Sequence, residues 1–238
     1  MAVLVVLAAL EGLRRLARAR SVQLFGTIVA RAETADRRVA LTFDDGPTPA
    51  VADSIIALLG SRDVRATFFV TGNELAAAPD AGRRLVEAGH ELGNHTFSHD
   101  RMVLKSQRFI RTEIERTDSL IRAAGQTELI FFRPPFGYKL AGLPWYLSRR
   151  GRTTVTWDIE PDSYPAVAAT SEGIVRHVLE RVQPGSIILL HIWYPSRATS
   201  LGAVAPLIDS LHARGYEVGP VRALLAEPPG PNRVVEPQ

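Results

Sequence analysis

The chain has 238 residues, enough for one sizeable core and for a single catalytic domain of the α/β class. Its formal net charge of +3 comes from arginines spread along the sequence, with no dense basic block interleaved with aromatics, so nucleic acid is not expected as a partner. Cysteine is absent, which excludes disulfides, thiolate metal ligands and a thiol nucleophile, and leaves oxygen and nitrogen atoms as metal ligands.

The N-terminal segment, residues 1–37, opens with about ten almost wholly apolar residues. Four basic residues come next: Arg14, Arg15, Arg18 and Arg20. The apolar run is about half of the ~20 residues that a membrane-spanning helix needs. It lacks the leading basic residues and the cleavage site of a secretory signal, and a basic cluster after it favours keeping the downstream chain in the cytoplasm. Three interpretations stay open: the end of a longer membrane anchor, an amphipathic helix lying on a membrane through residues 1–20, and a helix packed on the domain.

From Arg38 onward, short β-branched or aromatic runs alternate with longer helix-like stretches. This alternation is typical of repeated βα units and a parallel sheet. The predicted strands are Val39–Phe43, Ala66–Val70, Glu91–Gly93, Ile130–Phe132, Thr153–Trp157, Ser186–Leu190 and Tyr216–Val218.

Helices are predicted between these strands. Pro49 opens the first, and Asn73 caps a second that ends near Gly89. The others cover residues 106–124, 140–150, 171–182 and 200–214. The Pro-rich tail, residues 227–238, cannot continue a helix or a central strand and is expected to be disordered, which leaves residues 38–226 as the catalytic domain.

Polar side chains cluster where the predicted strands end. They are Asp44, Asp45, His95, His99, Arg133, the segment 158–162 and His191. In barrels of parallel strands this rim is where catalytic groups collect, because the loops can vary while the barrel holds them in place. We therefore expect these residues to share one site.

The acidic pair and the two histidines together predict a divalent-metal site for hydrolysis. Asp44 and Asp45 are neighbours, so their side chains point to opposite sides, and one can bind a metal while the other reaches a water. His95 and His99 are four residues apart, so on one helical turn both imidazoles face the same way. An Asp-His-His ligand set leaves positions open for water and substrate, as a catalytic site requires. Alone, the acidic pair is more typical of a turn.

Two further residues at strand ends extend this site. Arg133 is stiffened by the prolines that come after it, and it either holds a carboxylate base in position or forms a surface salt bridge. His191 is either a core residue or a proton donor to a leaving amine. If His191 is the proton donor, Leu189 and Leu190, which precede it, line an apolar notch for the methyl group of the acyl substrate.

With these motifs assembled, the sequence resembles the polysaccharide deacetylases of the NodB-homology group, carbohydrate esterase family four. The resemblance covers residues 38–226. The motifs, in the order of that family, are Thr-Phe-Asp-Asp-Gly, His-Thr-x-x-His, Arg-Pro-Pro-Phe-Gly, Trp-Asp and Leu-Leu-His. The resemblance implies a distorted (β/α)7-type barrel of parallel strands.

The resemblance also implies removal of acetyl groups from N-acetylated sugars of peptidoglycan or chitin-like polymers with zinc or a similar ion, cobalt or nickel included. By resemblance Asp44 is the base, His191 the acid and Arg133 the partner of the base. The implied metal ligands are Asp45, His95 and His99. A backbone N–H near Phe136 holds the oxyanion with the metal. We expect a monomer that lies outside the cytoplasm or is anchored in a membrane facing the cell wall. A location in the cytoplasm is the alternative.

One motif departs from that family. Where it commonly has an Asp followed by Trp to tune the catalytic histidine, this chain has Ser163 and Tyr164 in register, and Asp162, one residue earlier, is the candidate replacement. Without a neighbouring carboxylate His191 is less easily protonated, so the limb of the pH profile that depends on it moves to lower pH. The aromatics Trp157 and Trp193 are candidate substrate-binding residues; stacking on a sugar or covering the barrel end are both open for Trp193.

Three other functions compete with a polymer deacetylase. The same metal chemistry serves a deacetylase of small N-acyl substrates, and the altered 157–164 segment suits a catalytically weak carbohydrate-binding protein. A glycosidase that uses the acidic pair as its two carboxylates is disfavoured, because neighbouring residues diverge and do not easily flank a bond at the ~5–9 Å that such pairs require.

Overall fold

A computed structural model describes residues 1–226; the predicted tail lies outside the described residues. The strands are β1 (Ile28–Val29), β2 (Arg38–Asp44), β3 (Thr67–Val70), β4 (Glu91–Asn94), β5 (Thr154–Val155), β6 (Ile187–His191) and β7 (Glu217–Gly219). The helices are α1 (Ala2–Arg18), α2 (Pro49–Gly60), α3 (Gly72–Ala77), α4 (Pro79–Glu87), α5 (Gln107–Ala123), α6 (Gly142–Ser148), α7 (Pro165–Ala168), α8 (Ser171–Leu179), α9 (Ala198–Ala213) and α10 (Val221–Leu225).

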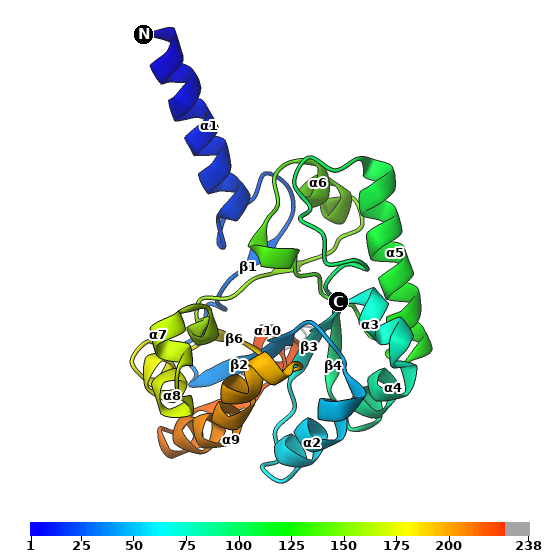
Figure 1. Ribbon diagram of the computed structural model, residues 1–238, viewed down its shortest axis with the longest axis vertical. Helices are drawn as coiled ribbons and strands as arrows, with labels where there is room; N and C mark the ends of the chain where they lie inside the picture. Colours follow the sequence, from blue (N-terminus) through cyan, green and yellow to red (C-terminus); the bar gives the residue numbers. More distant parts are fainter. Residues whose placement is uncertain (227–238) are drawn as a thin grey trace, which may run out of the picture.

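The strands form a distorted barrel, as predicted. β4, β3, β2 and β6 lie side by side in that order, all parallel, and β7 pairs with the start of β2. β1 pairs with β5 in parallel, and single bridges join this pair to the larger sheet. Phe132 bridges both Asn94 and Thr154, and Ile159 bridges Ile188. Figure 1 shows the strands in the middle of the molecule with α2, α8 and α9 along one side.

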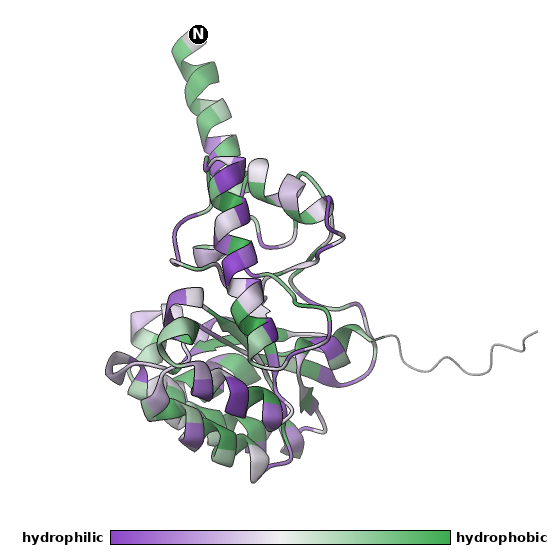
Figure 2. Cartoon of the chain, turned by 90° about the vertical axis from the view of Figure 1, so that its right-hand side faces the viewer, coloured by the Kyte–Doolittle hydropathy of each residue, from purple (hydrophilic) through white to green (hydrophobic). Residues whose placement is uncertain are grey.

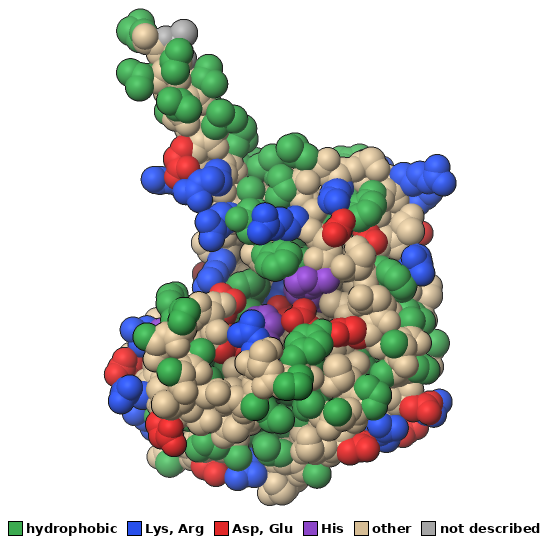
Figure 3. All heavy atoms as spheres, viewed as in Figure 1, with side chains coloured by type: hydrophobic (Ala, Val, Ile, Leu, Met, Phe, Trp, Pro, Cys, Tyr) green, Lys and Arg blue, Asp and Glu red, His purple; other side chains and the backbone are tan. Residues whose placement is uncertain are grey.

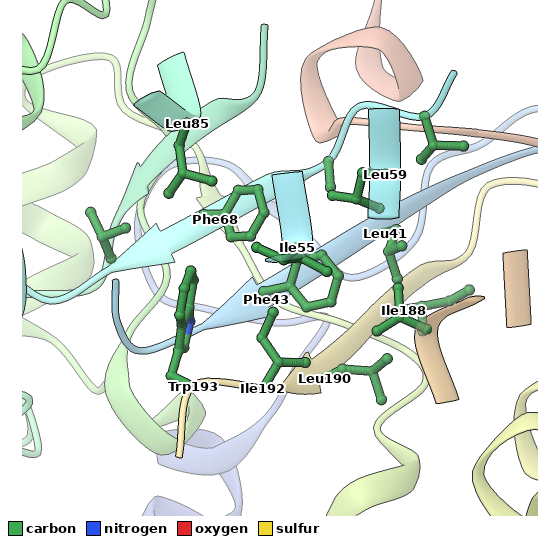
Figure 4. Packing of buried hydrophobic residues seen from close by; sticks show 14 of the residues in the cluster. Leu41, Phe43, Ile55, Leu59, Phe68, Leu85, Ile188, Leu190, Ile192 and Trp193 are labelled. Atoms are coloured by element: carbon green, nitrogen blue, oxygen red, sulfur yellow. The ribbon is translucent and has the colours of Figure 1, made fainter. Parts of the chain in front are cut away.

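Side chains alternate along β2 between the two faces of the sheet, and this alternation sets the position of the site. Leu41 and Phe43 belong to the main core between the sheet and its covering helices, where they pack with Ile55 and Leu59 of α2 (Figure 4). The intervening residues point into the barrel, so Asp44 at the end of the strand faces its interior. Ile188 and Leu190 of β6 lie in the same main core.

Two predicted elements differ from the observed ones. Residues 130–132 form only a bridge, because Pro134 and Pro135 come directly afterwards and have no N–H to continue a ladder. The helix predicted from Asn73 to Gly89 is two helices, since the chain breaks at Ala78 and Pro79 begins α4.

The strand β1 and the short helices α7 and α10 were not predicted, and β1 lies inside the segment 1–37. Its pairing with β5 makes part of that segment a member of the barrel, so a boundary at residue 38 is too late. Two residues are too few for a period of alternation to show in a sequence.

The helix α1 stands clear of the rest of the molecule over most of its length (Figure 1). Its N-terminal half is hydrophobic (Figure 2), and the side chains of Leu4, Leu7 and Leu10 are 71%, 56% and 57% exposed. Packing on the domain is confined to its last turn, where Ala17 is buried and its carbonyl accepts a hydrogen bond from the backbone N–H of Lys139 at 2.9 Å.

Candidate active site

The carboxyl ends of β2, β4 and β6 carry the predicted site residues. Asp44 is the last residue of β2 and His191 the last of β6, and the two are paired in register across the adjacent parallel strands. His95 comes directly after β4. The rim of the barrel therefore brings together the residues that the sequence analysis placed there.

Asp45, His95 and His99 converge, with one ligand atom of each within 4.8 Å of the others. His99 Nε2 lies 3.4 Å from Asp45 Oδ1, and the centroids of the two imidazole rings are 4.9 Å apart. The set offers one carboxylate oxygen and two imidazole nitrogens, the donor types that zinc takes in catalytic sites.

His95 is held in the form that binds a metal. Its Nδ1 lies 2.7 Å from the carbonyl oxygen of Arg133, so Nδ1 carries the proton and Nε2 presents its lone pair. Burial, followed by the charge of His99, lowers the pKa of His95 to about 3, which keeps the ring neutral at pH 7. The residues present therefore fit a divalent ion.

The two histidines reach one point without a helical turn, contrary to the sequence prediction. The chain bends after β4, and Thr96 and His99 both have positive φ, +68° and +60°. The Oδ1 atom of Asn94 accepts from the Thr96 N–H at 2.9 Å, and Thr96 Oγ1 accepts from the His99 N–H at 3.1 Å. Side-chain hydrogen bonds of this kind stabilise a turn that spacing alone did not reveal.

Asp44 and Arg133 form a buried ion pair beneath this cluster. Arg133 Nη1 donates to Asp44 Oδ1 at 2.6 Å, and both side chains are at most 3% exposed. The other guanidinium hydrogens go to three oxygens: Thr42 Oγ1 and the carbonyls of Val155 and Thr156. The surface salt bridge considered for Arg133 is therefore wrong, and its contact with the carboxylate is confirmed.

Asp162 is the carboxylate beside His191. Its Oδ2 accepts from the His191 backbone N–H at 2.7 Å, and His191 Nδ1 lies 3.3 Å from both carboxylate oxygens. Asp158 instead accepts from Ser186 and the Ile187 backbone, and Glu160 accepts from Trp157. The neighbouring carboxylates are thus committed to other partners.

The pair shifts both pKa values. Burial alone would lower the pKa of His191, but the hydrogen bond to Asp162 and its charge, with those of Asp44 and Asp45, raise it to about 9. Burial alone would raise the pKa of Asp162, yet His191 holds it below its usual value. His191 is therefore protonated at neutral pH, as a proton donor requires.

The predicted substrate-binding residues divide into one exposed and three buried side chains. Phe136 is 53% exposed, has φ +57°, and its ring meets the His99 ring edge-on at 4.7 Å. Trp193, in contrast, is 2% exposed and packs on Phe68 in the main core, so the prediction of a sugar-stacking surface is wrong there. Its neighbour Ile192 lies in the same core, so the loop after β6 turns inward.

Trp157 and Leu189 are buried in one cluster inside the barrel. The guanidinium groups of Arg133 and Arg20 lie over the Trp157 ring at 5.4 and 4.8 Å from its centroid. Trp157 is 4% exposed and packs beneath the site; substrate binding by Trp157 and an acyl notch walled by Leu189 stay predictions. The rings of Tyr164 and Tyr194 are exposed, and Tyr194 donates a hydrogen bond to Glu74.

Comparisons with known proteins agree with this geometry. The family model described as polysaccharide deacetylase matches residues 31–155. The chitooligosaccharide deacetylase of Bradyrhizobium sp. (strain ANU 289) is 32% identical over 200 residues, which cover 79% of this chain and 90% of that protein. This chain belongs to the polysaccharide deacetylase family.

Two further relatives show how widely the family varies. The peptidoglycan-N-acetylglucosamine deacetylase of Bacillus cereus is 30% identical over 190 residues, covering 80% of this chain and 89% of that protein. A crystal structure of a CE4 family pseudoenzyme from Bacillus anthracis superposes with a TM-score of 0.74 at 25% identity, covering 82% of this chain and 68% of that one. Members of the family are metal-dependent, in keeping with the Asp-His-His cluster of this one.

Gly46 fixes the turn directly after the acidic pair. It has φ +62°, and a Cβ atom placed on it would lie 2.4 Å from the ring of Trp193. Replacement by alanine forces either the loop of Asp45 or the buried indole to move.

We predict that Gly46→Ala lowers the free energy of unfolding by about 2–4 kcal/mol, from overpacking and the cost of positive φ. Chemical denaturation of the two proteins measures the change. The control is Gly60→Ala at the end of α2, where a Cβ meets no atom within 4 Å. Equal effects of the two substitutions would contradict the assigned contact.

Proposed function

We propose that this family member removes acetyl groups from N-acetylated sugars of a cell-wall or chitin-like polysaccharide. The observation that carries the proposal is the convergence of Asp45, His95 and His99 beside a buried carboxylate and a protonated histidine. The relatives named for chitooligosaccharide and for peptidoglycan support this class of substrate without choosing between the two polymers. All of these side chains come from a single chain, which suits a monomer.

The ligand set and the base have separate tasks. Asp45, His95 and His99 would hold the ion, and their oxygen and nitrogen atoms favour zinc, with cobalt or nickel as substitutes. A divalent ion bound there lowers the pKa of a water and polarises the acetyl carbonyl. Asp44 accepts a proton from the attacking water, while Arg133 fixes the orientation of its carboxylate.

His191 is the proton donor in this proposal. Its Nδ1 faces Asp162, which leaves Nε2 as the atom that delivers a proton to the departing sugar nitrogen. The backbone N–H near Phe136 stabilises the negative charge that develops on the acetyl oxygen. Asp162 keeps the imidazole charged and oriented, and so acts through His191.

A carbohydrate-binding protein without activity is the alternative, and the neighbour described as a CE4 family pseudoenzyme supports keeping it as a candidate. The enzyme is favoured because the contacts of the acidic pair, of the two metal-site histidines and of His191 are all present. A deacetylase of small N-acyl substrates needs the same contacts, so only a comparison of substrates distinguishes it from a polymer deacetylase.

The proposal predicts acetate release that depends on a metal. Peptidoglycan, chitin oligomers and xylan are each incubated with the protein, with the protein after chelation, and with the chelated protein after zinc is restored. We expect release from at least one N-acetylated glycan, loss on chelation and recovery with zinc. Release from none of them would favour the binding protein, and release only from small N-acyl compounds would favour the other hydrolase.

The Asp162–His191 contact predicts a shift in pH dependence. Activity needs protonated His191, so it is retained below the raised pKa and is lost as the pH rises through it. Asp162→Asn removes the charge that raises this pKa, and burial then lowers it, so the basic limb of the kcat/KM profile should move down by roughly one to two pH units. The control is Ser163→Ala, at the position where the family commonly has the Asp, and it should leave the basic limb in place. An unchanged limb in the Asn variant would refute the pairing.

We also propose that α1 associates with a lipid bilayer and that the enzyme works at the outer face of the membrane, near the polymer. Within residues 1–226, no helix is both long enough and apolar enough to cross a membrane. Exposed apolar side chains at Leu4 and Leu7, followed by the basic residues Arg14 and Arg15, suit shallow insertion into an anionic surface.

Sedimentation with anionic phospholipid vesicles tests this association. The full chain should sediment with the vesicles, and the variant Leu4→Glu/Leu7→Glu should stay in solution because two charges now face the acyl chains. Leu129→Glu, at a residue 52% exposed elsewhere on the domain, is the matched control and should bind as the unmodified protein does. Vesicle binding that survives the double substitution would refute the role of α1.

A further inference from the structure

A pocket of about 410 Å³ lies beside the metal ligands. Phe136 belongs to both, since it lines the pocket and its ring touches that of His99. The half-exposed ring of Tyr164 forms another part of the wall. The volume is in the range of small-molecule sites, and the aromatic walls suit the face of a sugar ring next to the one being deacetylated.

The pocket carries an excess of positive charge. Arg18, Arg20 and Arg101 line it, and Glu160 is the one carboxylate among its lining residues. Glu160 is already engaged, because its Oε2 lies 2.8 Å from Arg20 Nη2 and 2.7 Å from Trp157 Nε1. Figure 3 shows basic side chains bordering the hollow in which histidine side chains are visible.

Arg18 and Arg101 have no carboxylate within ion-pair distance and donate no side-chain hydrogen bond to any residue in the range 1–226. Each guanidinium instead lies over aromatic rings. Arg18 is 5.5 Å and Arg101 5.2 Å from the centroid of the same ring, Tyr138, and Arg101 is also 5.3 Å from Phe136. Stacking holds the planar group in place and leaves its N–H donors available to a ligand in the pocket.

The end of α1 is fixed at this pocket, which makes Arg18 part of it. The backbone N–H of Lys139 donates to the Ala17 carbonyl, and its ammonium donates to the Ala19 carbonyl. Thr156 Oγ1 donates to the carbonyl of Arg20 at 2.6 Å. These contacts come from separate segments of the barrel rim, so the arginines at residues 18 and 20 do not depend on the exposed part of the helix.

We propose that Arg18 and Arg101 bind a carboxylate on the sugar next to the acetylated residue, so that the enzyme selects acidic N-acetylated glycans over neutral ones. Both guanidinium groups lack an ion-pair or side-chain hydrogen-bond partner among the described residues, and they lie on the wall that the pocket shares with the metal site. A substrate carboxylate would supply that partner. The identity of the glycan rests on the proposed deacetylation, whereas the carboxylate site is tested by binding measurements alone.

The test compares two glycans that differ in carboxylate charge. One is a neutral oligomer of N-acetylglucosamine; the other alternates that sugar with its 3-O-lactyl ether, which adds a carboxylate to every second sugar. Binding is measured with the acetylated forms of both on zinc-loaded chains that carry His191→Ala and so lack the proposed proton donor, and KM and kcat are measured with the same substrates on chains that keep His191.

We expect the chain with both arginines to bind the acidic glycan more tightly, and Arg18→Gln/Arg101→Gln to weaken that binding about tenfold, with the neutral glycan changed less than twofold. KM for the acidic substrate should rise by a similar factor while kcat is kept. Arg18→Lys/Arg101→Lys retains the charge and should recover part of the loss. Arg149→Gln is the matched control, an exposed arginine over Trp145 outside the pocket.

Equal binding of the two glycans by the chain with both arginines, or equal weakening of both in the double variant, would overturn the carboxylate site. If the double variant fails to fold, Arg101→Gln alone must still lower the preference for the acidic glycan. Selective binding of the acidic glycan with no acetate release from either would refute the deacetylase function and leave the site standing.

Discussion

The buried ion pair between Asp44 and Arg133 is the interaction on which the site depends. Two charges at most 3% exposed are tolerated only because they are paired and hydrogen-bonded. Arg133 binds four oxygens, two from β2 and two from β5 and the residue after it. Removing either partner of such a pair typically costs about 3–5 kcal/mol, because the other charge stays buried. The position of the Asp44 carboxylate is therefore fixed by the fold itself.

The same segment also orients a metal ligand. The carbonyl of Arg133 accepts a hydrogen bond from His95 Nδ1, so one residue orients the proposed base through its side chain and a proposed metal ligand through its backbone. On the opposite side of β2, Asp162 orients His191 and keeps it charged. The proposed base and acid thus lie on two paired strands, each held by a partner of opposite charge, which suits two proton transfers at one acetyl group.

The sequence predicted the residues of the site better than the local conformations that bring them together. Six of the seven predicted strands correspond to observed ones, because hydrophobic periodicity results from burial on the two faces of a sheet. The turn from His95 to His99 was predicted as helical. The four-residue spacing indicates that the two side chains can meet, but it does not determine the backbone conformation between them. Two-residue β1 carries too little pattern to be found.

Burial of the aromatics was the main failure of sequence reasoning. Trp193 lies in the loop between β6 and α9, and Gly46, which has no side chain, leaves room for its indole in the core. Arg18 was predicted only as one of a cluster of basic residues and Arg101 was not singled out, because the aromatic rings beneath them come from a loop far away in sequence. Contacts between distant segments decide both cases, and no local pattern encodes them.

X-ray absorption at the zinc edge, on the protein loaded with one equivalent of zinc, tests the central claim most directly. The account predicts a first shell with two imidazole nitrogens and one carboxylate oxygen at about 2.0–2.2 Å, completed by water. A shell of oxygen atoms alone, or one with a single imidazole, would contradict the convergence of Asp45, His95 and His99 on one ion.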